Sequence, residues 1–223
     1  MITLHHLENS RSFRILWLLE ELGLDYELVE YKRDKASGQA EAELRKQHAL
    51  GKAPLLVDGE QVVIESGAII EYLLDRYGEG RFRPAPDSPD RIRYNYWLHA
   101  SEGTVMTLMI LSLFLNRMET QPPLPIRAIV KLVTGQVKTA YLNPNLKKII
   151  DYIEAELGEH KWFAGAEFTA ADVQMGFAMT ALSARAGLKK DHPNCQRWLE
   201  QVEARPAYQR AMERNGEMKL LGS

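Results

Sequence analysis

The segments of this 223-residue chain that favour β-strands all lie before residue 66, and this limits the fold more than any other feature. Residues 2–6 are rich in strand-forming types, and Tyr26–Tyr31, "YELVEY", alternates well enough for a second strand. Between them, an apolar block at residues 15–19 favours a helix that Gly23 would end. A strand, a helix and a strand within about 30 residues predict a right-handed parallel βαβ unit.

The clearest hairpin follows at residues 54–65, "PLLVDGEQVVIE", where two apolar runs flank Asp58 and Gly59. This dipeptide suits a tight turn because glycine accepts a positive φ without steric cost. Ser66 then precedes apolar residues at helical spacing, and Gly78 would close that helix. With a loop and a modest helix expected over residues 32–46, the order of elements in the first part is βαβ–α–ββα.

A proline-rich stretch, "EGRFRPAPDSPD" at residues 79–90, separates this part from the rest. Proline lacks the amide donor and the free φ that regular structure needs, so we place a linker at residues 81–90. The linker divides an α/β domain at residues 1–80 from an all-α domain at residues 91–223. The second domain is predicted to have helices near residues 91–117, 126–140, 144–157, 170–186, 194–204 and 206–214, with a break at prolines 122, 123 and 125.

Composition and charge argue against several classes of partner. The net charge is −2 and the basic residues are spread along the chain, so we expect no nucleic-acid partner. A single cysteine, Cys195, excludes an internal disulfide framework, and we interpret it as structural. The N-terminal residues lack a signal-peptide pattern and no run of about 18 apolar residues occurs, so we expect a cytoplasmic protein without a membrane partner.

Three short motifs contain candidates for chemistry. "NSRSFR" at residues 9–14 places Ser10, Arg11 and Ser12 where a helix offers unpaired amides; a serine there caps the helix or stabilises an anion. Ser66 has the same two interpretations at the next helix start. Pro54 stands at the beginning of a strand, where proline does not break ladder pairing. "FTAAD" gives Thr169 and Asp172 the spacing of a capping box, which is a structural signal.

In this order, "NSRSFR", "GKAPLLVDGEQVVIESGAIIEYL", the proline-rich linker and "FTAAD" resemble the glutathione transferase family over essentially the whole chain. The resemblance implies a thioredoxin-like first domain in which the Ala53-Pro54 bond is cis. It also implies that the backbone of Ala53 pairs with the cysteinyl part of glutathione like an added strand. Lys52 matches a position that contacts a glutathione carboxylate, while Glu65 and Ser66 match the motif that holds the γ-glutamyl end.

The resemblance also implies that Ser10 activates the thiol of glutathione, as in the serine-type classes. A thiol has a pKa of about 8.5, so activation means stabilising its anion. Lowering that pKa by about 2 units requires about 2.7 kcal/mol of differential stabilisation, which a hydroxyl donor and a helix terminus together can supply. Ser12 stays open as the alternative.

The second domain contributes further expectations. Glu102 resembles the acid that, in several classes, reaches the γ-glutamyl ammonium of glutathione in the other subunit, which implies a homodimer. Met106 and Met109 are candidates for an adaptable apolar wall against the second substrate, although methionines at this spacing also suit a plain core. His5 and His6 are consecutive on a strand and point to opposite faces, so we expect no metal site there.

The resemblance therefore implies a detoxifying glutathione transferase that attacks a small apolar electrophile, with glutathione as co-substrate and no metal. Two alternatives remain at this point. One is a glutathione-dependent disulfide reductase or peroxidase, which uses the same thiolate. The other is a non-catalytic protein on the same fold that binds ligands or partners, since fold does not fix function.

Overall fold

The computed structural model describes residues 1–33, 42–186, 188 and 191–216. Its first part contains one four-stranded sheet, in the order β2-β1-β3-β4. The parallel pairing of β1 with β2 and the antiparallel pairing of β3 with β1 and β4 confirm the predicted βαβ unit and hairpin. The strands are β1 (Ile2–Leu7), β2 (Tyr26–Tyr31), β3 (Leu55–Asp58) and β4 (Gln61–Ile64).

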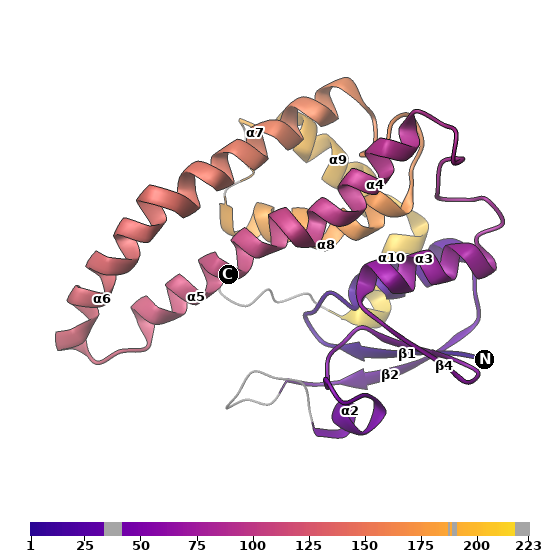
Figure 1. The fold of residues 1–223 in the computed structure, drawn as a ribbon, viewed down its shortest axis with the longest axis horizontal. Coiled ribbons are helices and arrows are strands. Elements are labelled where there is room, and N and C mark those ends of the chain that lie inside the picture. The colour runs from indigo at the N-terminus through magenta and orange to yellow at the C-terminus, as the bar shows by residue number, and fades with distance from the viewer. Residues whose placement is uncertain (34–41, 187, 189–190, 217–223) are drawn as a thin grey trace.

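Helices cover both faces of this sheet (Figure 1). On one face, α1 (Phe13–Leu22) and α3 (Ser66–Tyr77) join β1 and β3 in the main hydrophobic core. On the other face, the short helix α2 (Ala42–Gln47) contributes Leu44 to a small separate cluster. The loop predicted before α2 falls largely on residues 34–41, which lie outside the described residues.

In the described residues after Tyr77, every regular element is a helix, which confirms the predicted fold class of a thioredoxin-like α/β domain followed by an all-α domain. The α5–α6 hairpin extends away from the sheet (Figure 1). The α-helices are α4 (Asp90–Ala100), α5 (Thr107–Thr120), α6 (Leu124–Val137), α7 (Asn143–Glu159), α8 (Ala170–Ala186), α9 (Pro193–Glu203) and α10 (Pro206–Asn215). Two π-helical turns join α4 to α5 and α6 to α7: η1 (Ser101–Met106) and η2 (Lys138–Leu142).

The predicted break between residues 140 and 144 is wrong, because α6, η2 and α7 follow one another without interruption. Pro144 favours a break because a proline inside an α-helix loses a hydrogen bond and clashes with the preceding turn. Here the wider turn of η2 ends immediately before it, and a π-turn accommodates such an irregularity. A helix therefore continues through a residue that usually ends one.

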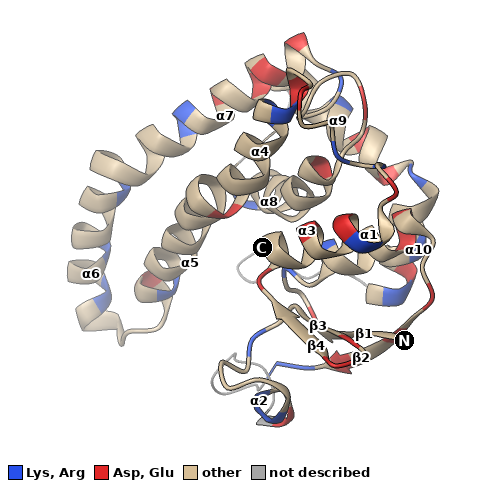
Figure 2. Ribbon diagram, turned by 45° about the vertical axis from the view of Figure 1, so that its right-hand side comes forward, with Lys and Arg blue, Asp and Glu red and all other residues tan. Residues whose placement is uncertain are grey.

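The helix Asp90–Thr120 is long and apolar enough, by length and composition alone, to cross a bilayer. Part of its apolar surface packs in the protein interior, where Tyr94, Trp97, Val105 and Met109 are buried in the main core. Core packing therefore accounts for part of the hydropathy of the helix, while Phe114 and Met118 stay exposed. Figure 2 shows Lys and Arg distributed over both parts of the chain, as they are in the sequence.

The two parts pack directly on each other through α1. Trp17 of α1 lies against Gly176 of α8 so closely that a Cβ there would stand 2.7 Å from the indole ring. The Arg205 guanidinium makes two hydrogen bonds, of 2.6 and 2.8 Å, to the Glu21 carboxylate. The segment between Tyr77 and Asp90 contains no helix or strand, and the domain limits of 1–80 and 91–223 stay a prediction.

The buried carboxylate of Asp172 fixes the start of α8. It accepts hydrogen bonds from the amides of Phe163 and Thr169 and from the indole of Trp198, at 2.9–3.0 Å. The predicted capping box is thus half present. The Thr169 amide donates to the Asp172 carboxylate, while the Asp172 amide donates to the Thr169 carbonyl instead of its hydroxyl, which itself donates to the Asp172 carboxylate. Burial raises the pKa of Asp172 to about 6, against the opposite effect of these donors.

Replacing Asp172 by Asn is expected to lower the free energy of unfolding by about 2–4 kcal/mol, because an amide cannot accept from every donor that the carboxylate satisfies. Urea denaturation followed by circular dichroism measures this loss. The matched control is Asp151→Asn, which removes a half-exposed carboxylate paired with Lys147 on α7 and is expected to change stability by less than about 0.5 kcal/mol. Equal losses in the two variants would contradict this role for Asp172.

Candidate functional site

Two connected hollows lie where the end of β1 faces the helical part. The larger, which we call the large cavity, has a volume of about 430 Å³ and is lined by β1–α1 loop residues, by α5 and by α8. The smaller, which we call the groove, has about 140 Å³ and lies beside the start of α3. The two share Arg11, Leu50, Lys52 and Ala53. One ligand can therefore occupy the groove and extend into the large cavity.

Ser10 and Ser12 occupy different environments in the loop between β1 and α1, residues 8–12, which we call the elbow. Ser10 lines the large cavity, whereas Ser12 is fully buried beneath it. The Ser12 hydroxyl donates to the Leu7 carbonyl at 3.2 Å and accepts from the Leu7 amide at 3.1 Å, which fastens the elbow to β1. The structure thus gives Ser10 access to a ligand and gives Ser12 a structural position.

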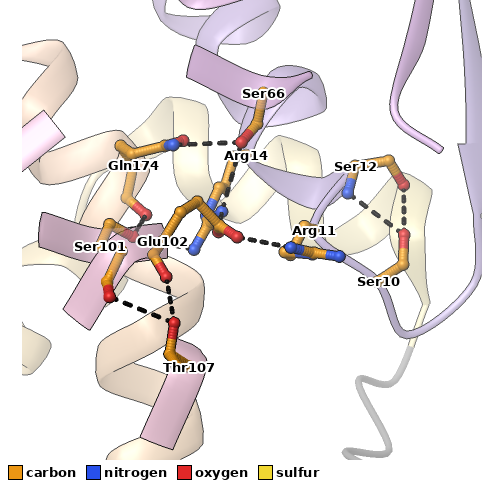
Figure 3. Close-up of polar contacts among 10 residues, drawn as sticks. Ser10, Arg11, Ser12, Arg14, Ser66, Ser101, Glu102, Thr107 and Gln174 are labelled. Atoms are coloured by element: carbon orange, nitrogen blue, oxygen red, sulfur yellow. Dashed lines mark hydrogen bonds and ion pairs between the residues drawn. The ribbon is translucent and has the colours of Figure 1, made fainter. Parts of the chain in front are cut away.

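A chain of hydrogen bonds runs from β1 to Ser10. The His6 ring Nδ1 lies 2.9 Å from the Ser12 hydroxyl. The Ser12 hydroxyl in turn lies 2.7 Å from the Ser10 hydroxyl (Figure 3). Burial lowers the pKa of His6 to about 4, so the ring is neutral near pH 7. The Ser12 amide also donates to Ser10 Oγ at 3.2 Å. The Ser10 oxygen accepts from the Ser12 amide, and its own proton can turn either to Ser12 Oγ or to a ligand in the cavity.

The fully buried guanidinium of Arg14 is the centre of a hydrogen-bond network that connects α1, α3, η1 and α8 at the site (Figure 3). It forms an ion pair with Glu102 of η1 and donates to Ser101 Oγ at 3.0 Å and to Ser66 Oγ of α3 at 3.4 Å. The Gln174 side chain of α8 donates to the same Ser66 oxygen at 3.1 Å, and the main-chain carbonyl of Gln174 accepts from the Ser101 hydroxyl. Ser66 is therefore held from two sides, although it does not cap its helix.

Glu102 receives a second guanidinium, because Arg11 donates to its other oxygen at 2.5 Å. Burial tends to raise the pKa of Glu102, but Arg14 and Arg11 outweigh it and hold that pKa below its ordinary value. The carboxylate is thus ionised at neutral pH and remains 30% exposed. Its contact with glutathione of another subunit stays a prediction, which this single chain does not test.

The groove brings together the residues that the sequence singled out around the proline. The Ala53-Pro54 peptide bond is cis, as the resemblance implies. Lys52, Ala53, Pro54, Glu65 and Ser66 all line the groove. Glu65 precedes α3 with φ at 68°, a conformation in the left-handed region that a non-glycine residue adopts rarely. The first amides of α3 beyond it have no partner within the helix, so this end of the groove favours an anion.

The predicted apolar wall is present, and several polar residues that the sequence analysis missed accompany it. Met106 and Met109 line the large cavity together with Phe177 of α8. Arg14 was a detectable signal, since it is the one cation in the otherwise apolar stretch at residues 13–19. Nothing local marked the other missed residues, which come from distant segments: Gln174, Arg33, Arg45 and Arg185.

Other candidate groups have structural positions. Cys195 is fully buried on α9, where burial raises the pKa of its thiol and makes it unreactive. Within the part of the chain that the structure describes, no three His, Cys, Asp or Glu side chains gather as metal ligands do. The expectation that no metal takes part is not tested by that finding.

Two family models match the chain. The model described as "Glutathione S-transferase, N-terminal domain" matches residues 1–75, and the model described as "Glutathione S-transferase, C-terminal domain" matches residues 106–206. Together they cover most of the chain. Every sequence motif that carries the resemblance, except the proline-rich linker, lies within these two matches.

Similar proteins bear names of the same family. Glutathione S-transferase 3 of Schizosaccharomyces pombe is 38% identical, over 96% of this chain and 88% of that protein. A solved glutathione S-transferase of Actinobacillus pleuropneumoniae is also 38% identical, with a TM-score of 0.81, over 100% of this chain and 97% of that chain. A theta class enzyme of Xanthomonas axonopodis, solved with glutathione bound, is 24% identical with a TM-score of 0.72, over 98% and 99% of the two chains, and shows the fold alone.

Replacing Glu102 by Gln is expected to lower the free energy of unfolding by about 3 kcal/mol at pH 7, because it leaves the Arg14 guanidinium buried without a counter-charge. Since the folded-state pKa of Glu102 lies below its unfolded value near 4.5, its stabilising effect is present above that pH and is lost as the pH falls through the folded value. Urea denaturation at several pH values should show the difference between parent and variant shrinking in acid.

The matched control is Glu43→Gln, which removes a 62% exposed carboxylate paired with Lys46 on α2. That variant is expected to differ from the parent by less than about 0.5 kcal/mol at every pH. A Glu102→Gln deficit that matched the control, or that stayed constant between pH 7 and pH 3, would contradict the role given to this ion pair.

Proposed function

The chain belongs to the glutathione S-transferase family and is a glutathione transferase, and from this premise we propose how its residues perform the reaction. Glutathione lies in the groove with its thiol at Ser10, and the electrophile lies in the large cavity. The observation that carries the proposal is the position of Ser10, which lines the large cavity beside the Lys52 and Ala53 positions that the two hollows share.

The groove holds the peptide of glutathione. The Ala53 backbone, set before β3 by the cis bond to Pro54, pairs with the cysteinyl residue as an added strand. The γ-glutamyl carboxylate accepts from Ser66 and the first amides of α3, and its ammonium faces Glu65. Lys52, which is exposed at the rim, pairs with the other carboxylate. Glu65 at one end of the groove and Lys52 at the other carry opposite charges, and this fixes the direction in which the peptide binds.

At the elbow, the Ser10 hydroxyl donates to the sulfur and favours its anion. The hydrogen bond from the Ser12 amide to Ser10 Oγ polarises the Ser10 hydroxyl, whose proton turns to the sulfur when glutathione binds. Arg11, which also lines the large cavity, adds positive potential. A charge-assisted hydrogen bond contributes about 1.5–3 kcal/mol, the size needed to lower the thiol pKa by about 1–2 units.

The thiolate then attacks the electrophile, which rests against Met106, Met109 and Phe177. A carbon–sulfur bond forms. In a substitution, the leaving group departs with the electron pair of the bond that breaks. In an addition to an activated double bond, the π electron pair moves onto the electron-withdrawing group and takes up a proton from solvent. The thiol proton has already left to solvent when glutathione binds. The protein needs to supply only binding, orientation and anion stabilisation for this reaction.

The remaining expectations complete the proposal. The active form is a homodimer in the cytoplasm, and Glu102, whose carboxylate is held by Arg14 and Arg11 yet partly exposed, faces the γ-glutamyl ammonium of glutathione in the partner subunit. The disulfide reductase alternative is less favoured, because the elbow carries serine and Cys195 is buried away from the site. A protein without turnover would not need the elbow, the proline and the groove together.

Replacing Ser10 by Ala is expected to raise the thiol pKa of bound glutathione from about 6.5 to about 8, because the donor to the sulfur is gone. The ultraviolet absorbance of the thiolate, followed against pH in the complex, measures this pKa. Calorimetry of glutathione binding by the same variant is expected to give nearly the parent affinity at pH 5.5, where the thiol is protonated in both proteins.

Ser12→Ala is the matched comparison. It leaves Ser10 in place but removes the bonds of Ser12 to Leu7 and His6, so it is expected to lower stability by about 1–3 kcal/mol and to raise the thiol pKa by less than about 0.7. A larger pKa increase in Ser12→Ala than in Ser10→Ala would reverse the assignment. Loss of glutathione binding in the parent itself would remove the proposal altogether.

A further inference from the structure

The hydroxyl of Ser12 has more polar neighbours than it can bond at once. The Leu7 amide and carbonyl lie 3.1 and 3.2 Å from Ser12 Oγ. The Ser10 hydroxyl lies 2.7 Å and His6 Nδ1 lies 2.9 Å from the same oxygen. A serine hydroxyl has one proton to donate and two lone pairs with which to accept. The Leu7 amide only donates and the Leu7 carbonyl only accepts, so the roles of Ser10 and His6 are the ones that can change.

The tautomer of His6 decides both roles. The ring is neutral near pH 7, because burial lowers its pKa to about 4 and the opposing effect of Asn215 on α10 is smaller. A neutral imidazole carries one proton, either on Nδ1 or on Nε2. His6 Nδ1 therefore either donates to Ser12 Oγ or accepts from it, and two different arrangements of the hydroxyl protons follow.

With the ring proton on Nδ1, the donors of the chain point towards the large cavity. Ser12 Oγ then accepts from the Leu7 amide and from His6, so both of its lone pairs are occupied. The Ser12 proton turns from the Leu7 carbonyl at 3.2 Å to Ser10 Oγ, the nearer acceptor at 2.7 Å. Ser10 Oγ thus accepts from both the amide and the hydroxyl of Ser12, and its own proton turns to the large cavity, which Ser10 lines.

With the ring proton on Nε2, the same chain points the other way. Nδ1 of His6 then accepts the Ser12 proton, and the second lone pair of Ser12 Oγ is left for Ser10. The Ser10 proton turns inward, so Ser12 competes for it with a sulfur in the large cavity. Donation to the sulfur would leave a lone pair of the fully buried Ser12 without a donor, which weakens the stabilisation of a thiolate.

We propose that His6 is a positioning residue for thiol activation, which holds its proton on Nδ1 when glutathione is bound, so that Ser12 and then Ser10 donate towards the sulfur. This inference rests on the proposed function, since it requires the thiol of glutathione to lie at Ser10. A negative charge at the end of a chain of hydrogen bonds favours the arrangement in which every donor points to it. His6 is buried and lines neither hollow, so it acts on the sulfur only through Ser12.

Two substitutions separate the ring nitrogens. The amide nitrogen of asparagine lies as many bonds from Cα as histidine Nδ1 does, whereas that of glutamine lies one bond further, near the position of Nε2. His6→Gln is expected to raise the thiol pKa of bound glutathione by about 0.8, because Ser12 then competes for the Ser10 proton. His6→Asn restores a donor to Ser12 and is expected to raise the same pKa by less than about 0.3.

The ultraviolet absorbance of the thiolate, followed against pH in each complex, measures this pKa. Calorimetry at pH 5.5, where the thiol is protonated, shows whether a variant has a damaged binding site. Both His6 variants are expected to bind glutathione there with an affinity within about twofold of the parent value, because the groove is intact and only the proton order behind Ser10 has changed.

The matched control is His5→Gln. His5 precedes His6 on β1 and is also buried, but its Nδ1 lies 2.8 Å from the Tyr31 hydroxyl and has no part in the chain to Ser10. This variant is expected to leave the thiol pKa within about 0.2 of the parent value. A double variant tests the route: added to Ser12→Ala, His6→Gln is expected to change the thiol pKa by less than about 0.2, because the residue through which His6 acts is absent.

The tautomer itself can be read in the parent protein. Two-bond 15N–1H correlation spectra of the glutathione complex at pH 7.5, with the His6 signals assigned by their loss in His6→Asn, are expected to show the proton on Nδ1. A proton on Nε2, an unchanged thiol pKa in His6→Gln, or an equal increase in the Ser12→Ala background would overturn the role of His6 alone. Failure of glutathione to bind, or a thiol pKa that Ser10→Ala leaves unchanged, would instead overturn the proposed function.

Discussion

The buried ion pair between Arg14 and Glu102 connects the two parts of the molecule at the site. A guanidinium with no exposure is costly unless its charge is balanced and its donors find acceptors. Here Glu102 balances the charge, and Ser101 and Ser66 accept from the terminal nitrogens, while Nε has no acceptor among the described residues. The pair therefore requires α1, the start of α3 and η1 to keep their relative positions. The loop before α1, the start of α3 and η1 each contribute to a wall of the groove or the large cavity.

The remainder of the site follows from that arrangement. With α1 fixed, Ser12 anchors the elbow to β1 from below, and Ser10 is left facing the large cavity. The cis bond at Pro54 places Ala53 beside the same elbow, so that a peptide in the groove presents its thiol to a hydroxyl donor. Arg11, which lines the large cavity beside Ser10, then adds positive potential that favours the thiolate.

Local patterns predicted what depends on local chemistry. The alternation at Tyr26–Tyr31, the Asp58-Gly59 turn and the Gly23 helix end each correspond to an observed element, and the family resemblance implied the cis bond at Pro54. The continuity of α6 and α7 through Pro144 escaped prediction, because a π-turn leaves no recognisable pattern in the sequence. The positions of Arg33 and Arg185 on the wall of the large cavity escaped it too, since only the tertiary fold brings the residue after β2 and the end of α8 to one hollow.

The central claim is that glutathione is held as a thiolate at neutral pH, and proton release on binding tests it most directly. Calorimetric titrations of glutathione at pH 7.5, in buffers of different ionisation enthalpy, give the number of protons released. Because free thiol has a pKa of about 8.5 and the bound thiol is expected near 6.5, binding should release close to one proton per glutathione. Binding that released no proton would show that the bound thiol keeps its ordinary pKa, and would contradict the account.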